Sequence, residues 1–295
     1  MDRDILSAIK DSLPDFSKGQ KRIAHYILEH YDEAAFMNAA VLGSVAHVSE
    51  STVVRFAMQL GYKGYPEFLR DLSALVKSKL TSIQRVGVAK MLIGEEDMVE
   101  RVLTLDADCV KKSIRVVDRA DFKAAVEAIV NAENIYILGI RSAFALAVFL
   151  NCYLSMIFKN VKLISSTSAS EMFEQIRAIG REDIMIGLSF PRYSQRTVKA
   201  LDYARKRGAR VLSITDSEHS PLVEFSDYKL LAKCEIMSFV DSLVSPLSVI
   251  NALLLAVGMA KQDELQEAFA ELEEIWDEYD VYDKGAYDDK TAEKL

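Results

Sequence analysis

The chain has 295 residues, half of them hydrophobic and about a quarter charged, with a formal net charge of −8. This length favours two domains, and this composition excludes collagen-like, mucin-like and wholly disordered chains. The apolar runs are shorter than the roughly 18–20 residues that cross a membrane, and the acid-containing N-terminus does not resemble a signal peptide. Cys109, Cys152 and Cys234 lack disulfide-pair or zinc-site spacing, which indicates free thiols. We therefore expect a globular protein of the cytoplasm with no membrane partner.

The negative charge is concentrated at the C-terminus. Residues 1–80 hold 10 basic and 10 acidic side chains, whereas residues 262–295 hold 13 acidic and 3 basic ones. We interpret the acidic tail as a solvated segment that aids solubility. The first part is neutral, so it would attract the phosphates of a nucleic acid less than a basic domain would.

Residues 1–77 are predicted to form a compact all-helical domain. Apolar residues recur at helical spacing within residues 5–13, 23–27 and 41–45. The following residues, 78–95, combine Ser, Thr and Gly with polar side chains. We predict that they form a linker.

The sequence LGSVAHVSESTVVRFAMQLGYKGYPEF, residues 42–68, predicts two helices joined by a tight turn. Ser49 is expected to open the second helix, with its hydroxyl capping the amide of Ser51 or Thr52. Ala46 is small where the two helices must cross closely, and the buried anchors between them are Val48, Val53, Val54 and Leu60. This pattern is typical of a helix-turn-helix unit, although an ordinary helical hairpin would share much of it.

In a helix-turn-helix unit, the start of the second helix enters the major groove of double-stranded DNA. A helix start rich in short polar side chains, with an arginine on the next turn, is not needed for packing but suits base readout. Lys63 and Tyr65, just beyond the helix, are predicted to reach the DNA backbone. The residues predicted to lie near base edges or phosphates are Ser49, Glu50, Ser51, Thr52 and Arg55.

Residues 96–260 are predicted to form an α/β domain. After a helical region at 96–130, short apolar runs alternate with helix-length segments. This alternation implies a five-stranded parallel sheet with helices on both faces, in three layers. The predicted strands are 135–140, 161–165, 184–190, 211–215 and 228–231, and the predicted helices are 142–158, 168–180, 195–208 and 242–260. A last helix near 262–280 has an apolar face that we expect to pack on a neighbour, for example a second subunit.

Hydroxyl groups and arginines follow three of the predicted strands. Ligands of an open parallel sheet bind beyond the carboxyl ends of its strands, where helix N-termini offer free amides. Hydroxyls suit a polyol and an arginine suits a phosphate. Ser168 is instead expected to cap its helix as a capping box with Glu171, and Arg196 is expected to face solvent. The predicted ligand residues are Arg141, Ser142, Ser166, Ser189, Arg192, Tyr193 and Ser194.

These segments resemble a known family. SESTVVRFAMQLGYKGYPEF resembles the N-terminal domain of the RpiR family of bacterial transcription regulators. ILGIRSA, IGLSFPRYSQRTVKALDYARKRGARVLSITD and HSPL resemble the sugar isomerase (SIS) phosphosugar-binding domain that this family carries C-terminally. The resemblance covers roughly residues 1–255 and implies a homodimeric or homotetrameric repressor or activator. Its binding to an operator would change when a phosphorylated sugar occupies the second domain.

The domain assignment follows from both lines of reasoning. We assign residues 1–77 to the helix-turn-helix domain and 78–95 to the linker. Residues 96–260 form the SIS domain, and 261–295 form a C-terminal helix and acidic tail. The linker and the helix at 96–117 are the expected transmitters between the two domains.

The first ligand turn departs from the family pattern at one position. Gly139 and Ser142 match the glycine and serine that follow the first strand of the family's sheet. Arg141 displaces the usual second glycine of this turn.

The second ligand loop departs further. The common loop reads Ser-x-Ser-Gly-x-Thr; here Ser189 matches the first serine and Ser194 replaces the threonine. Pro191 and Arg192 stand where the second serine and the glycine belong. This exchange removes a hydroxyl and adds a charge, so the resemblance predicts an effector different from those of better-matched relatives, with Arg192 at the phosphate.

Two alternatives stay open. A phosphosugar isomerase needs a general base, for which His219, Glu171 and Glu235 are candidates, but no feature pairs His219 with an orienting acid. A sugar-phosphate sensor that has lost DNA binding would also fit the neutral first domain. The sequence contains no P-loop, HExxH motif, nucleophile elbow or complete GxGxxG, and no histidine has metal-ligand spacing. We predict no catalytic residue, bound metal or cofactor.

Overall fold

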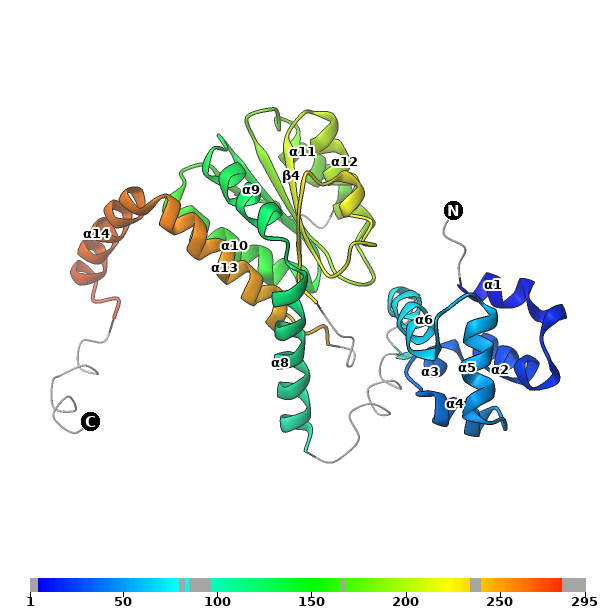
Figure 1. The fold of residues 1–295 in the computed structure, drawn as a ribbon. Coiled ribbons are helices and arrows are strands. Elements are labelled where there is room, and N and C mark those ends of the chain that lie inside the picture. Colours follow the sequence, from blue (N-terminus) through cyan, green and yellow to red (C-terminus); the bar gives the residue numbers. More distant parts are fainter. Residues whose placement is uncertain (1–4, 80–82, 85–96, 166–167, 234–239, 283–295) are drawn as a thin grey trace, which may run out of the picture. The chain divides into compact units, whose positions relative to one another are not determined.

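The computed structural model describes most of the chain, and Figure 1 traces it. The described residues are 5–79, 83–84, 97–165, 168–233 and 240–282. The chain forms two compact units. The first comprises Met1–Arg115, Phe190–Ser194 and Lys233–Ser245, and the second comprises Val116–Ser189, Gln195–Ala232 and Pro246–Leu295.

The N-terminal part of the first unit is a cluster of short helices, which confirms the predicted all-helical fold. Their starts are set by local capping: Ser17 and Gln20 form a reciprocal capping box, and the Asn38 side chain accepts a 2.9 Å hydrogen bond from the Val41 amide. The helices are α1 (Ile5–Asp11), α2 (Lys18–Glu29), α3 (Tyr31–Ala34), α4 (Ala39–Val45), α5 (Glu50–Gln59) and α6 (Tyr65–Lys79), with a short 3₁₀ turn at Leu13–Asp15.

Aromatic and aliphatic side chains from several of these helices form one core. Phe56 of α5 lies at the centre, with its ring centroid 5.0 Å from that of Phe16 and 5.7 Å from that of Phe68. Ile9 and Ile23 are fully buried in the same cluster. The core therefore fixes α5 on its apolar side and leaves its polar side outward.

Helix α8 (Met98–Val116) belongs to the first unit and is anchored by buried hydroxyl groups. The Ser113 hydroxyl lies 2.6 Å from that of Ser245 and accepts a 2.7 Å hydrogen bond from the Lys233 amide. About two turns earlier on the helix, Asp106 accepts a 2.5 Å hydrogen bond from the Ser242 hydroxyl. These bonds tie α8 to Lys233, to Ser242 just before α13 (Val244–Ala260), and to Ser245 in the first turn of α13.

The second unit contains a five-stranded sheet in the order β2-β1-β3-β4-β5, with every neighbouring pair parallel. This confirms the predicted sheet. β1 and β3 are buried along their whole length, because both faces of a parallel sheet are covered by helices. The strands are β1 (Ile135–Gly139), β2 (Val161–Leu163), β3 (Ile184–Leu188), β4 (Arg210–Thr215) and β5 (Tyr228–Leu231).

Helices cover both faces of the sheet, as Figure 1 shows for the yellow-green α11 and α12 on one side and for α9, α10 and α13 on the other. α10 packs along β1 and β2, and α12 packs along β3 and β4. The helices not yet given are α9 (Arg119–Val130), α10 (Ser142–Ile157), α11 (Ala169–Ile176), α12 (Gln195–Lys206) and α14 (Gln262–Glu278). The three-layer architecture is the predicted one.

The strand order has a consequence for ligand binding. The chain moves outward from β1 to β2 on one side and then returns to β3 on the other, so the order reverses between β1 and β3. A crevice opens at such a switch point beyond the carboxyl ends of the strands. The segments after β1 and β3 are therefore the ones that the fold places at a ligand.

No single helix in the described part of the chain is long and apolar enough to cross a membrane. α13 and α14 meet the length and hydropathy criteria only as a pair, and they are bent by 97° at their junction. One face of α13 is used in packing, since Ile250, Leu253 and Val257 are fully buried, whereas Leu255 and Met259 are exposed.

Candidate DNA-reading helix and ligand pocket

The turn between α4 and α5 brings the two helices into close contact. A Cβ atom at Gly43 would lie 2.9 Å from the Val48 carbonyl oxygen, which is closer than real Cβ contacts. Ala46 is also buried, as the sequence predicts, but the closest approach is at Gly43. In the sequence, an isolated glycine within a helical pattern is the feature that indicates such a close approach.

Ser49 occupies the N-cap position of α5, but it does not cap the helix through its side chain. Its hydroxyl lies 2.9 Å from the Ser51 hydroxyl and 2.8 Å from the Thr52 hydroxyl. The predicted bond from Ser49 to a backbone amide is therefore wrong, because the neighbouring hydroxyls compete for it. The result is a row of three linked hydroxyls at the start of α5.

The predicted base-reading residues share this helix start. Glu50, Ser51 and Arg55 are exposed, and the Arg55 guanidinium donates a 3.2 Å hydrogen bond to the Ser51 carbonyl oxygen. This bond holds the arginine against its own helix and points its charge outward from the core. The geometry suits direct readout, and contact with DNA stays a prediction.

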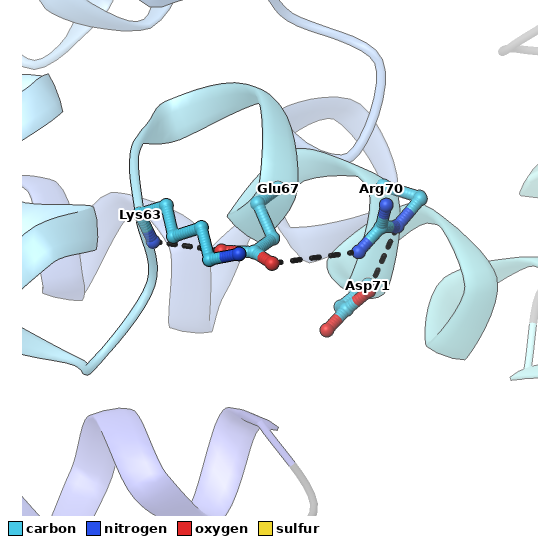
Figure 2. Close-up of polar contacts among 4 residues, drawn as sticks. All are labelled: Lys63, Glu67, Arg70 and Asp71. Atoms are coloured by element: carbon cyan, nitrogen blue, oxygen red, sulfur yellow. Dashed lines mark hydrogen bonds and ion pairs between the residues drawn. The ribbon is translucent and has the colours of Figure 1, made fainter.

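Figure 2 shows the polar contacts at the start of α6, next to Lys63. The Lys63 amide donates a 2.7 Å hydrogen bond to the Glu67 carboxylate, while the Arg70 guanidinium lies 3.8 Å from Glu67 and 3.3 Å from Asp71. Two carboxylates thus offset the charge of Arg70. Within the described residues the exposed Lys63 ammonium group forms no ion pair, so it is the cation of this turn that could meet a phosphate.

The prediction that Tyr65 reaches the DNA backbone is wrong. Tyr65 is 3% exposed, and its hydroxyl donates a 2.8 Å hydrogen bond to the Met37 carbonyl oxygen. Burial also raises the pKa of the phenol. Its ring packs beside Phe68 in the core, so Tyr65 fixes the start of α6 instead of contacting a ligand.

A pocket of about 550 Å³ opens at the carboxyl ends of β1 and β2. It lies at the edge of the sheet where the strand order reverses, and that is where a ligand is expected. Arg141 lines it, as predicted for a ligand residue, and so does Arg196, which is exposed as predicted. The other lining residues are Gly139, Ile140, Phe144, Ile164 and Ser165.

The backbone after β1 is unusually tight. A Cβ atom at Gly139 would lie 2.4 Å from the Ala143 carbonyl oxygen, so only glycine fits there. Arg141 follows with φ of 61° and ψ of −127°, in the left-handed region that favours glycine, and it begins α10 without a side-chain cap. Arg192, in the loop between β3 and α12, also has a positive φ, of 65°. At both positions the chain has arginine where the family pattern has glycine.

The other predicted ligand residues do not line the pocket within the described part of the chain. Ser142 is exposed on the first turn of α10. Ser189 is 5% exposed, and its carbonyl oxygen accepts a 2.8 Å hydrogen bond from the Thr215 hydroxyl. Tyr193 and Ser194 are half-buried in the loop that joins β3 to α12. Ser166 lies outside the described residues.

The isomerase candidates show no catalytic arrangement among the described residues. His219 is exposed, and its backbone amide donates to the Ser217 hydroxyl at 3.2 Å. Glu171 is exposed on α11, where its amide donates a 3.1 Å hydrogen bond to the Ser168 hydroxyl; this confirms Ser168 as the cap, which is one half of the predicted capping box. Glu235 lies outside the described residues. The described part of the chain also holds no group of three or more metal-ligating side chains.

The chain matches two protein-family models. Residues 3–79 match the helix-turn-helix domain of the rpiR family, and residues 128–256 match the SIS domain. Among curated proteins, an uncharacterised HTH-type transcriptional regulator of Haemophilus influenzae is 25% identical over 229 residues. That alignment covers 77% of this chain and 79% of the relative.

Two solved structures resemble the fold. The sugar isomerase domain of an RpiR transcription factor from Sphaerobacter thermophilus is 26% identical with a TM-score of 0.58, covering 61% of this chain and 99% of that one. The Vibrio vulnificus NanR protein complexed with ManNAc-6P is 21% identical with a TM-score of 0.57, covering 92% of this chain and 98% of that one. At the lower identity the likeness concerns the fold alone.

Proposed function

The chain belongs to the RpiR family of transcriptional regulators, with a helix-turn-helix domain and a SIS domain, and from this we propose that it is an effector-controlled DNA-binding protein. It binds an operator through the start of α5, and this binding changes when a phosphorylated sugar occupies the pocket at β1 and β2. The observation that carries the proposal is the pocket itself, because two arginines line it at the switch point of the sheet. Such a regulator acts in the cytoplasm, where the DNA is.

The DNA half of the proposal rests on the exposed start of α5. Arg55 and Glu50 are exposed there beside three linked hydroxyls, and such groups read base edges in a major groove. The domain is electrically neutral, so each copy gains little from phosphate attraction. A homodimer or homotetramer doubles or quadruples the contacts and compensates for this weakness.

The ligand half rests on charge. Arg141 and Arg196 both carry a guanidinium, which binds phosphate oxygens through two parallel hydrogen bonds. The fold neighbour NanR is described as complexed with ManNAc-6P, which supports a phosphorylated sugar as the ligand class. None of the seven described lining residues is an acid or a histidine, so the lining offers no general base for isomerisation. This favours a sugar phosphate that acts as a regulatory ligand over one that is an enzyme substrate.

The coupling between ligand and DNA requires that the ligand bind two states of the protein with different affinity. We assign the transmission to the linker and to α8. The hydroxyl bonds that tie Asp106 and Ser113 of α8 to Ser242 and Ser245 give this helix a defined attachment that a shift could break or strengthen.

The test is fluorescence anisotropy with the full chain and its own promoter region, titrated over salt and then with a panel of phosphorylated sugars. We expect specific, salt-sensitive binding that at least one panel member changes. Arg55→Ala should weaken binding by about ten-fold or more, as for loss of a base contact. The matched control is Arg177→Ala, an exposed arginine in the second unit, which should leave DNA affinity unchanged. Absence of binding at low salt with every ligand present would overturn the proposal.

A further inference from the structure

Three cations lie close together on helix α2, although the first domain is neutral as a whole. Residues 18–28 contain three basic side chains and no acidic one. These side chains, Lys18, Lys21 and Arg22, are exposed, and their spacing of three and four residues places them on one face of the helix. In the described part of the chain, none of the three forms a side-chain hydrogen bond or an ion pair. We call this surface the basic face of α2.

The first turn of α2 contacts the first turn of α5, where the base-reading residues are expected. α2 packs against α5 (Figure 1). A Cβ atom at Gly19 would lie 3.3 Å from the methyl carbon of Thr52, so the two helix starts touch. The Gln20 side chain also donates a 2.7 Å hydrogen bond to the Gln59 side chain, which fixes α2 along α5. Arg22 follows Gly19 by three residues and is therefore its neighbour on the surface of α2.

Arg55 lies on the side of α5 that adjoins α2. It follows Thr52 by three residues and precedes Gln59 by four, and these are the two residues that meet α2. Arg55 and Arg22 are both exposed, and each neighbours the contact between the two helices from its own helix. A duplex that met Arg55 through a base edge would therefore present the phosphates beside its groove to the basic face of α2.

The basic face is unfavourable within the folded domain. Like charges three or four residues apart repel each other and destabilise a helix. Lys18 is such a neighbour of both Lys21 and Arg22, and residues 18–28 include no carboxylate to offset them. Phosphates of DNA would neutralise the three cations, and the counterions condensed on the duplex would be released. The cations therefore fit a polyanionic partner, and their position beside α5 identifies this partner as the DNA that α5 reads.

We propose, on the basis of the function proposed above, that α2 is a second DNA-contacting element, whose Lys18, Lys21 and Arg22 bind backbone phosphates beside the groove that α5 enters. Arg55 and the hydroxyls at the start of α5 read the bases. The basic face of α2 positions the domain on the duplex without distinguishing sequences, as phosphate contacts do. The domain thus has a local attraction for phosphates although its net charge is zero.

The test separates phosphate contacts from base contacts by their salt dependence. Fluorescence anisotropy with the full chain would measure the affinity for its own promoter fragment and for an unrelated duplex of equal length over a range of salt concentrations. Loss of one phosphate contact lowers the slope of log affinity against log salt by about 0.9, which corresponds to about five-fold in affinity at about 0.15 M salt. We expect Lys18→Gln, Lys21→Gln and Arg22→Gln each to show this change. Both duplexes should lose affinity by the same factor.

Matched variants assign the effect to the charges of the basic face. Lys21→Arg keeps the charge and should keep both affinity and slope. Lys159→Gln removes an exposed lysine of the second unit and should change neither. Arg55→Ala should lower the ratio of promoter affinity to unrelated affinity, because it removes a base contact. Thermal unfolding should show no loss of stability in the glutamine variants of α2, since their side chains are exposed and repel one another.

The inference is overturned if the glutamine variants of α2 keep the salt slope of the unchanged chain, or if Lys159→Gln lowers this slope as much as they do. A lower ratio of promoter to unrelated affinity at constant slope would also overturn it, because α2 would then act on base readout. In these cases the chain still binds its promoter and the proposed function stands. If the unchanged chain does not bind its promoter at low salt with any phosphorylated sugar present, the proposed function and the inference fail together.

Discussion

The Tyr65 hydroxyl donates a 2.8 Å hydrogen bond to the Met37 carbonyl oxygen, which joins the start of α6 to the segment before α4. Both groups are buried, so neither can exchange this bond for water. We predict that Tyr65→Phe lowers the free energy of unfolding by about 1 kcal/mol, because the carbonyl loses its donor. Urea unfolding of the full chain measures this loss as a change in the unfolding transition of the first unit.

The same variant should leave DNA affinity unchanged, since the phenol does not reach the surface. Anisotropy titrations of Tyr65→Phe and the unchanged chain against the same promoter fragment check this. A weaker DNA complex at unchanged stability would mean that the hydroxyl contacts DNA after all.

The close approach at Gly43 predicts a second effect on stability. In Gly43→Ala the new methyl group would lie 2.9 Å from the Val48 carbonyl oxygen, a backbone atom that cannot turn away. Overpacking costs roughly 1–3 kcal/mol, which outweighs the gain of up to about 1 kcal/mol from replacing glycine in a helix. We expect a net loss of about 1 kcal/mol or more in thermal or urea unfolding.

Gly180 provides the matched control for this substitution. A Cβ atom there meets nothing within 4 Å, so Gly180→Ala should leave stability nearly unchanged. Equal effects of the two substitutions would show that the turn between α4 and α5 is not as tight as its geometry indicates.

The sheet could be predicted because parallel strands buried on both faces appear as short apolar runs. IYILG and IMIGL have no charged or amide side chain, and their hydrophobic continuity is a direct consequence of helices on both faces. The order of the strands could not be predicted in the same way. The strand order depends on which face of the sheet each crossover helix packs against, and no single residue in a strand determines that.

The candidate sites were harder to predict because local chemistry does not reveal burial. Tyr65 has a polar group that looks available in the sequence, but packing beside Phe68 turns it into the core. Arg196 is exposed, as expected, and the return of the chain from β2 to β3 also places it at the pocket. Both outcomes depend on contacts between residues far apart in the chain, which periodicity cannot report.

A buried hydroxyl in β4 predicts a substitution that does not lower stability. Ser213 is fully buried, and its hydroxyl has no hydrogen-bond partner among the described residues. A buried polar group without a partner is unfavourable by about 1–3 kcal/mol. Ser213→Ala should therefore be neutral or stabilise the second unit by up to about 1 kcal/mol in urea unfolding.

Thr215 in the same strand is the control for Ser213. It is equally buried, but its hydroxyl is hydrogen-bonded to the Ser189 carbonyl oxygen and to the Ser220 hydroxyl, each at 2.8 Å. Thr215→Val should destabilise the unit, because these partners lose a bond. The prediction is contradicted if Ser213→Ala destabilises as much as Thr215→Val.

The N-cap of α9 predicts a pH dependence. The Asp118 carboxylate accepts hydrogen bonds from the amides of Asp121 and Ala120, and these bonds lower the pKa of Asp118. A group with a lowered folded-state pKa contributes stability above its unfolded pKa, near 4, and this stability is lost as pH falls through the folded pKa. We expect the contribution to be complete at pH 6 and to decline below about pH 4.

Asp118→Asn isolates this contribution, because asparagine also caps helices but does not titrate. The difference in melting temperature between the unchanged chain and Asp118→Asn should be constant from pH 5 to 7 and should shrink below about pH 4. A difference that does not vary with pH would show that the Asp118 charge adds nothing to the cap.

The strained backbone at Arg141 predicts that the chain gains stability when this arginine is lost. At φ of 61°, Arg141→Gly removes a cost of roughly 1–3 kcal/mol, while glycine adds up to about 1 kcal/mol of entropy to the unfolded chain. The second unit should therefore unfold at a higher temperature in Arg141→Gly, measured without ligand. Arg141→Ala removes the same charge but keeps a Cβ atom at the same φ, so it should show no such gain. If both variants stabilise equally, repulsion between Arg141 and Arg196 is the cause, and the strain at this turn contributes little.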